Sequence, residues 1–319
     1  MDKIFEEIRR NGLIPVMKFR DVSNAVPTCE ALSRAGLNVA EITFRTDAAE
    51  ESIKAVCKAM PGLLVGAGTV TKIEQAERAV AAGARFIVTP GLNSHIVEWC
   101  IERKVAILPG VNGPSGIEVA MEYGLDCLKF FPAEATGGVN FIKAVRGPYA
   151  QISFVPTGGV NEENLAEYLS TPGVVACGGS WMVPDAAIEK GDFAAVETLV
   201  RKAIRIILDF KLAHIGVNTN SESEALEAAN HFAYLFGFDT NVGNSSVMAG
   251  TAVEFMKQPF LGKNGHIGIR TADIERAKYF LGRAGFEFME DTAKYDSRGN
   301  LKAIYIKDEI AGFAIHLVQ

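Results

Sequence analysis

Residues 127–134 read Cys-Leu-Lys-Phe-Phe-Pro-Ala-Glu and place one cation, Lys129, in a stretch that otherwise has the character of a buried strand. Pro132 marks the end of such a strand, because proline cannot donate to a strand ladder. Burial disfavours the ammonium form of a lysine, so Lys129 can act as a free amine that attacks a carbonyl and forms a Schiff base. The plainer alternative is a lysine that reaches water at the strand end or pairs with a carboxylate.

Glu41 lies in a second apolar run and supplies a carboxylate to the same interior. A carboxylate beside an amine nucleophile suits general acid–base chemistry. The alternative is a purely structural ion pair between Glu41 and Lys129.

Arg45 follows Glu41 by four residues, so both share one side of the sheet only if the strand is still regular there. With Thr69, the guanidinium of Arg45 could hold a carboxylate in a two-pronged contact. A salt bridge to Asp47 or Glu50 is the alternative.

Two glycine turns, at residues 158–159 and 178–180, follow the apolar runs 152–156 and 174–177. These runs are the seventh and eighth of eight such runs in the first 180 residues. Backbone amides without a neighbouring Cβ can close on a phosphate, and Ser180 adds a hydroxyl donor. Glycine pairs also occur in turns for conformational reasons alone. Their presence after both of these strands nevertheless predicts a phosphate site there.

Eight short runs rich in β-branched residues alternate with amphipathic stretches, a pattern of repeated βα units. The pattern predicts an α/β fold with a closed (β/α)8 TIM barrel, whose chemistry lies at the carboxyl ends of its strands. An open doubly wound sheet is less favoured, since no Gly-x-Gly-x-x-Gly opens the first βα turn. The expected strands are residues 13–17, 39–44, 63–67, 86–88, 106–108, 127–131, 152–156 and 174–177.

The region 213–319 repeats itself after a long helix expected at 193–212. Each copy opens with a similar segment, His214-Ile-Gly-Val in the first and His266-Ile-Gly-Ile in the second. In both copies a predicted helix follows, and a closing strand of similar sequence ends the copy. Two strand–helix–strands units of this size would stack into one smaller α+β domain of two βαβββ-like repeats. The predicted domains are therefore 1–212 and 213–319.

Composition narrows the class of protein. A formal charge of −6 without a Lys/Arg cluster argues against nucleic acid or an anionic membrane as the main partner. We expect no membrane span, since no run approaches about 20 apolar residues. The first ten residues lack a signal-peptide core, and the five cysteines are odd in number with no Cys-x-x-Cys pair. We therefore expect a cytoplasmic protein.

Six segments of the first 212 residues resemble, in order, the 2-dehydro-3-deoxy-phosphogluconate (KDPG) and 4-hydroxy-2-oxoglutarate (KHG) aldolase family. The segments begin at Glu41, Val65, Pro90, Leu128, Pro156 and Gly178.

The resemblance implies a homotrimeric, metal-free class I aldolase that acts on a small-molecule 2-oxo acid, as in the Entner–Doudoroff pathway. Ser180 and the glycine turns favour a phosphorylated substrate, and an unphosphorylated one remains the alternative. The aldolase would cleave KDPG to pyruvate and glyceraldehyde 3-phosphate, or KHG to pyruvate and glyoxylate. Lys129 is implied as the Schiff-base lysine and Glu41 as the acid/base. The implied substrate-binding residues are Arg45, Thr69, Pro90, Phe131, Thr157, Gly158, Gly159, Gly179 and Ser180. Residues 111–116 depart from the family pattern, so we expect a different rim after the fifth strand.

The second region resembles the vicinal oxygen chelate superfamily of glyoxalases, extradiol dioxygenases and resistance proteins. This resemblance implies a shared divalent-metal site, and the matching positions are His214, Glu254, His266 and His316. A final histidine in place of the usual carboxylate departs from that pattern. Three alternatives remain open: an accessory domain that modulates or stabilises the first domain, a second enzyme with metal-dependent chemistry, or a module for small-molecule binding or oligomerisation without chemistry.

Overall fold

The computed structural model describes residues 3–319. The chain divides into two compact units, Met1–Ile207 and Leu208–Gln319. The predicted helix 193–212 is too long: α10 (Phe193–Leu208) stops before Asp209, whose φ of 44° is left-handed, and β10 (Lys211–Asn218) begins two residues later. A left-handed residue ends a helix because it breaks the repeat of backbone dihedrals.

Within residues 3–207, nine strands form a six-stranded and a three-stranded sheet, which together make one curled layer. The strands are β1 (Leu13–Met17), β2 (Val39–Thr43), β3 (Leu64–Gly68), β4 (Phe86–Val88), β5 (Ala106–Leu108), β6 (Gly110–Val111), β7 (Cys127–Phe130), β8 (Ser153–Pro156) and β9 (Cys177–Gly179).

The sheet is parallel and curled. One run of pairing has the order β5-β4-β3-β2-β1-β9 and a second the order β6-β7-β8. The amide of Lys129 donates to the carbonyl of Pro109, between β5 and β6, and an isolated bridge joins Thr157 after β8 to Gly178 in β9. The predicted α/β fold with a parallel sheet is thus confirmed.

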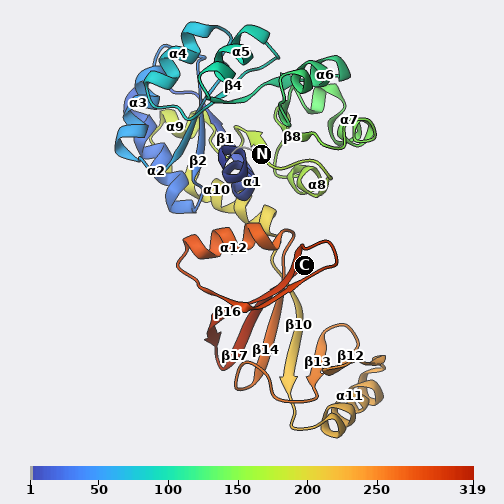
Figure 1. The fold of residues 1–319 in the computed structure, drawn as a ribbon. Coiled ribbons are helices and arrows are strands. Elements are labelled where there is room, and N and C mark those ends of the chain that lie inside the picture. Colours follow the sequence, from blue (N-terminus) through green and yellow to red (C-terminus); the bar gives the residue numbers. More distant parts are fainter. Residues whose placement is uncertain (1–2) are drawn as a thin grey trace. The chain divides into compact units, whose positions relative to one another are not determined.

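Helices cover the outside of this curl (Figure 1). Their inward faces are apolar, whereas the strands are buried almost throughout, as expected for a parallel sheet covered by helices. The helices are α1 (Lys3–Asn11), α2 (Ala25–Ala35), α3 (Ala49–Ala59), α4 (Ile73–Ala81), α5 (Ser94–Glu102), α6 (Pro114–Glu122), α7 (Gly138–Val145), α8 (Leu165–Ser170), α9 (Asp185–Glu189) and α10, with 3₁₀ turns Val22–Asn24 and Glu134–Thr136.

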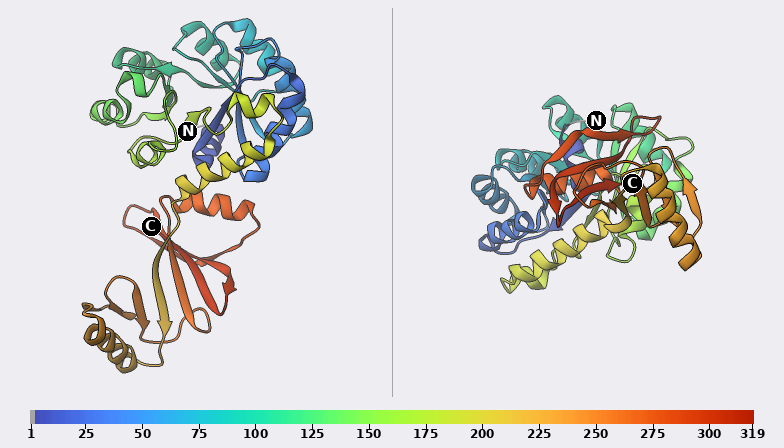
Figure 2. Two further views of the ribbon diagram at one scale, coloured as in Figure 1. Left: turned by 180° about the vertical axis from the view of Figure 1, so that it is seen from behind. Right: turned by 90° about the horizontal axis from the view of Figure 1, so that it is seen from below.

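The second unit is built on one eight-stranded sheet of order β11-β12-β13-β10-β14-β17-β16-β15. Seen from behind in Figure 2, its strands form a twisted layer. Besides β10, the elements are α11 (Glu222–Phe236), β11 (Thr240–Val242), β12 (Ser246–Ala249), β13 (Val253–Met256), β14 (Gly265–Arg270), α12 (Ile274–Arg283), β15 (Phe288–Tyr295), β16 (Leu301–Ile310) and β17 (Phe313–Val318).

Two halves of this unit have the same order of elements. In each half a strand is followed by a helix and three strands, and the last strand pairs in parallel with the first: β13 with β10, and β17 with β14. The antiparallel pair β10–β14 joins the halves at the centre of the sheet. The four strands that begin and end the halves therefore lie side by side.

Local signals explain both helices of this unit. The Ser221 hydroxyl accepts from the amide of Glu224, and Gly237 with φ of 70° ends α11. The Asp273 carboxylate accepts from the amide of Arg276 at the start of α12. No helix in the described residues is long and apolar enough to cross a membrane.

Candidate active site and candidate metal centre

Lys129 and Glu41 face each other inside the curled sheet of the first unit. The lysine Nζ lies 3.6 Å from the Glu41 Oε1, and the two residues are 5% and 2% exposed. That oxygen is buried and has no hydrogen-bond partner in the described residues. A buried carboxylate oxygen without a partner costs free energy unless a ligand or water binds it. The geometry therefore leaves an acceptor free beside the amine.

Glycine at position 68 makes room for Glu41. Glu41 is central in β2, opposite Gly66 of β3, and a Cβ built on Gly68 would lie 2.0 Å from its Oε1. A larger residue at the end of β3 would therefore displace the carboxylate. The sequence alone did not predict this role for Gly68.

A cavity of about 320 Å³ opens above Lys129. All nine predicted substrate-binding residues line it: Arg45, Thr69, Pro90, Phe131, Thr157, Gly158, Gly159, Gly179 and Ser180. The structure also adds Val16 and Val160, which the sequence analysis missed because nothing in their apolar side chains distinguishes them from core residues. Glu41 is not among the lining residues and lies deeper.

Arg45 reaches the cavity from a turn, because β2 ends at Thr43. The condition for Glu41 and Arg45 to share one strand face is therefore not met. The Arg45 Nε donates to the Thr69 Oγ1 over 3.2 Å. Of the two alternative partners, Glu50 binds Arg78 instead, and no ion pair joins Arg45 to Asp47 within residues 3–319. The guanidinium thus remains exposed toward an incoming anion.

The turn after β8 has the backbone of an anion site. Gly158 and Gly159 have φ of 95° and 86°, in the left-handed region that favours glycine. No acceptor among residues 3–319 binds the amides of Gly158, Gly159 or Val160. Successive free amides in such a turn form a concave nest that binds anions.

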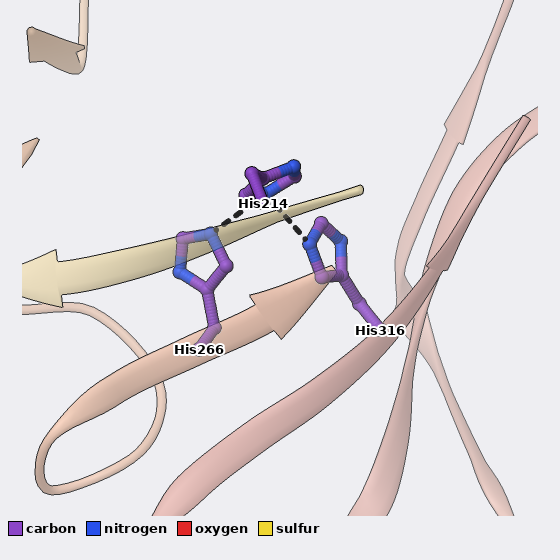
Figure 3. Close-up of side chains that lie close together, drawn as sticks. All are labelled: His214, His266 and His316. Atoms are coloured by element: carbon purple, nitrogen blue, oxygen red, sulfur yellow. Dashed lines mark hydrogen bonds between the residues drawn. The ribbon is translucent and has the colours of Figure 1, made fainter. Parts of the chain in front are cut away.

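Three histidines converge in the second unit (Figure 3). They come from β10, β14 and β17, and the Nε2 of His214 lies 3.1 Å from the Nε2 of both His266 and His316. The Oε2 of Glu254, from β13, lies 3.1 Å from the His266 Nε2 and 3.5 Å from the His214 Nε2. The structure therefore brings together all four predicted metal ligands.

These separations fit a coordinated cation. A tetrahedral zinc ion with bonds of about 2.0–2.1 Å has ligand atoms about 3.3 Å apart. Hydrogen bonds alone cannot satisfy the cluster, because a neutral imidazole nitrogen either donates or accepts. If the His266 Nε2 donates to Glu254, it cannot also accept from His214; if it accepts from His214, it cannot donate to Glu254. In either case one of these two close contacts has no hydrogen bond. A cation would satisfy all of them at once.

The ionisation of the cluster also favours metal binding. Burial lowers the pKa of His214, and burial with the neighbouring histidines lowers the pKa of His316 to about 3. Hydrogen bonds from His266 and Ser246 lower the pKa of Glu254 to about 2, against the effect of burial. These three groups are therefore in the metal-binding form at neutral pH.

Glycines and neighbours shape this cluster. A Cβ on Gly216 would lie 2.1 Å from the ring of His266, and one on Gly268 would lie 2.5 Å from the ring of His214, so each ring covers the glycine of the opposite strand. Tyr305 stacks on His316 at 4.6 Å. The buried Nδ1 atoms of His266 and His316 have no partner in the described residues, so the hydrogen bonds that usually orient metal-bound imidazoles are lacking there.

Comparison with known proteins gives a consistent family for the first unit. A family model described as "KDPG and KHG aldolase" matches residues 4–199. The 2-dehydro-3-deoxy-phosphogluconate aldolase of Haemophilus influenzae is 45% identical over 205 residues, which cover 64% of this chain and 97% of that protein.

Two solved structures are similar over the same part. The KDPG aldolase of Legionella pneumophila, with pyruvate captured at low pH as a covalent carbinolamine intermediate, is 35% identical with a TM-score of 0.62. It covers 63% of this chain and 98% of its own. The corresponding aldolase of Zymomonas mobilis with 3-phosphoglycerate is 38% identical with a TM-score of 0.60, and covers 63% and 94%.

Proposed function

Because the chain belongs to the KDPG and KHG aldolase family, whose members are aldehyde-lyases that use a covalent lysine–pyruvate intermediate, we propose that it cleaves 2-dehydro-3-deoxy-6-phosphogluconate to pyruvate and glyceraldehyde 3-phosphate. The observation that carries this proposal is the buried pair of Lys129 and Glu41 beneath the cavity. We further propose that the curled sheet is a (β/α)8 barrel and that the protein is a homotrimer.

Lys129 is the nucleophile in this proposal. Its neutral amine adds to the C2 ketone of the substrate, and loss of water gives a protonated imine that can accept electrons. Arg45 and Thr69 would hold the adjacent carboxylate, since the guanidinium is exposed to the cavity and already oriented by the threonine. Phe131, whose ring centroid lies 5.3 Å from the Lys129 Nζ, would form the wall beside the imine.

Glu41 is the proposed acid and base. Directly or through a water, its carboxylate removes the proton of the C4 hydroxyl; the C3–C4 bond then breaks, and its electrons pass to the imine. An aldehyde leaves, and the enamine that remains is protonated at C3. Hydrolysis of the imine then frees pyruvate and restores Lys129.

A phosphorylated substrate is supported by the far end of the cavity. The free amides of Gly158, Gly159 and Val160 and the exposed Ser180 hydroxyl can surround an oxyanion there. The Zymomonas mobilis relative was solved with 3-phosphoglycerate, itself a phosphate ester. Unphosphorylated 4-hydroxy-2-oxoglutarate is the alternative substrate, and it would leave these amides to water.

Borohydride reduction tests the proposal. The protein is incubated with pyruvate and sodium borohydride, and the adduct is located by intact-mass spectrometry and peptide mapping. We expect one pyruvyl adduct on Lys129, absent from Lys129→Ala and retained in Lys143→Ala, a change at an exposed lysine on α7. Trapping at another lysine, or none in folded protein, would contradict the assignment. Comparing kcat/KM for the phosphorylated and unphosphorylated substrates then decides between them.

The second unit has its own candidate function. We propose that it is a vicinal-oxygen-chelate-like domain of two βαβββ repeats that binds one divalent cation through His214, Glu254, His266 and His316. Four ligand atoms lie close together with too few protons for a hydrogen bond at every close contact, which supports a bound cation. With such an ion, the second unit could act as a second, metal-dependent enzyme. The alternative is a module for small-molecule binding or oligomerisation.

Metal analysis separates these alternatives. We expect about one divalent ion per chain after purification, lost in His266→Ala and kept in His231→Ala, which changes an exposed histidine on α11. An absence of metal in the wild type, with no change in melting temperature when zinc or manganese is added, would favour a module without metal chemistry.

A further inference from the structure

Two side chains outside the cavity brace the proposed phosphate turn. Glu134 follows the strand of Lys129, and a Cβ built on Gly159 would lie 2.5 Å from its Cγ. The aliphatic part of Glu134 therefore packs directly on the glycine. Neither Glu134 nor its partner Tyr168 lines the cavity.

Backbone bonds attach the same segment to the turn. The amide of Ala133 donates to the Thr157 carbonyl over 2.9 Å, and the amide of Glu134 donates to the Gly158 carbonyl over 3.0 Å. With both carbonyls bound on this side, the peptide planes of the turn are fixed. The unbonded amides of Gly158 and Gly159 are then held in one orientation.

Tyr168 fixes the Glu134 side chain. This tyrosine on α8 is fully buried, and its hydroxyl donates a short hydrogen bond to the Glu134 Oε1. Among residues 3–319 it is the one side-chain partner of that carboxylate. A Cβ on Gly138 would lie 3.0 Å from the carboxylate oxygen and 3.2 Å from the tyrosine hydroxyl, so the pair is closely surrounded. Burial and the adjacent carboxylate raise the pKa of Tyr168, which keeps its proton.

We infer that Tyr168 and Glu134 are positioning residues that hold the Gly158–Gly159 turn in the shape that receives the substrate's phosphate. This inference rests on the proposed function, because it assumes that the phosphate binds at this turn. The tyrosine hydroxyl binds the Glu134 side chain outside the cavity. Loss of the hydroxyl would free this side chain, which packs on Gly159, to move.

The test uses the full chain and compares aldehydes with and without phosphate. In Tyr168→Phe we expect the KM for glyceraldehyde 3-phosphate, in condensation with pyruvate, to rise about five- to tenfold, as for loss of one hydrogen bond of ordinary strength. The KM for unphosphorylated glyceraldehyde and the exchange of pyruvate methyl protons in D₂O should stay within twofold. Tyr149→Phe is the matched control. The Tyr149 hydroxyl donates to the Glu118 Oε1 over 2.8 Å, and neither residue lines the cavity.

Glu134 supplies a second pair of variants if Tyr168→Phe folds poorly. Glu134→Gln keeps an acceptor for the tyrosine and should stay within twofold of wild type, whereas Glu134→Ala should raise the KM for the phosphorylated aldehyde at least fivefold. An equal rise for both aldehydes, an equal effect of Gln and Ala, or no rise in any variant would overturn the inference. No methyl-proton exchange in the wild type would overturn the proposed function and this inference with it.

Discussion

The substitution Gly68→Ala should separate the proposed acid–base role of Glu41 from the proposed nucleophilic role of Lys129. The added methyl would lie 2.0 Å from the Glu41 Oε1 and 2.7 Å from its Cγ and Cδ, whereas non-bonded heavy atoms prefer about 3.5 Å or more. The carboxylate must therefore move by about 1 Å or more. Its backbone is held between β1 and β3, so the movement falls on the side chain.

A displacement of this size has a predictable cost. Misplacing a catalytic group by about 1 Å lowers a rate about 10²-fold, and general acid–base catalysis as a whole is worth about 10²–10⁴-fold. We therefore expect kcat for cleavage to fall about 10²- to 10⁴-fold. Overpacking should also lower the free energy of unfolding by about 1–3 kcal/mol. Imine formation at Lys129 should persist, because the amine itself is untouched.

The assay measures pyruvate release from the phosphorylated substrate and borohydride trapping of pyruvate on the same samples, with circular dichroism to verify folding. Gly62→Ala is the control, since a Cβ there would meet nothing within 4 Å. Cleavage within threefold of wild type in folded Gly68→Ala would refute the proposed acid–base role of Glu41. Loss of trapping together with cleavage would show that the two residues cannot be separated in this way.

Three further predictions concern the second unit and the effect of removing it. Gly216→Ala places a methyl 2.1 Å from the His266 ring, so we expect metal content to fall at least tenfold with the fold retained by circular dichroism; unchanged metal content would contradict the ligand assignment. In EDTA-treated protein, His316 has a pKa of about 3 when folded and about 6.5 when unfolded. The unfolded chain therefore binds more protons in that window, and the free energy of unfolding should fall as the pH drops from 6.5 toward 3. Glu254, with a folded pKa of about 2, should add a loss below pH 4.5, and a urea midpoint that is constant from pH 7 to 4 would contradict both. A chain ending at residue 210 should still trap pyruvate at Lys129 if the units act independently, and loss of trapping in a folded truncation would refute that independence.

Much of the first unit could be predicted from its sequence, because a parallel sheet buries both faces and leaves apolar runs that are easily recognised. The runs at β1, β4 and β5 have the predicted bounds. Prediction failed where a single backbone conformation decides the outcome. Neither the left-handed Asp209 that ends α10 nor the continuation of the sheet as β6 after Pro109 has an apolar pattern that would reveal it.

The candidate sites were also predicted only in part. Side chains with chemistry of their own, such as Lys129, Glu41 and His266, were visible in the sequence. The residues that contact other side chains at and near the sites were not, because Ser246, Tyr305 and Tyr168 resemble ordinary core or surface positions. Their role depends on which atoms the fold places opposite them, namely the Glu254 carboxylate, the His316 ring and the Glu134 carboxylate.

Both candidate sites share one feature, a strand glycine that faces a polar side chain of the neighbouring strand. A glycine in a strand is normally a loss, since it packs nothing and costs backbone entropy. Gly68 and Gly216 offset that cost by leaving a volume that one polar side chain fills from the neighbouring strand: Glu41 in the first unit and His266 in the second. The position of each of these polar side chains therefore depends on the glycine that faces it, whether or not a ligand is bound. Preorganisation by an absent side chain would therefore be lost on adding one methyl, although the methyl touches neither substrate nor metal.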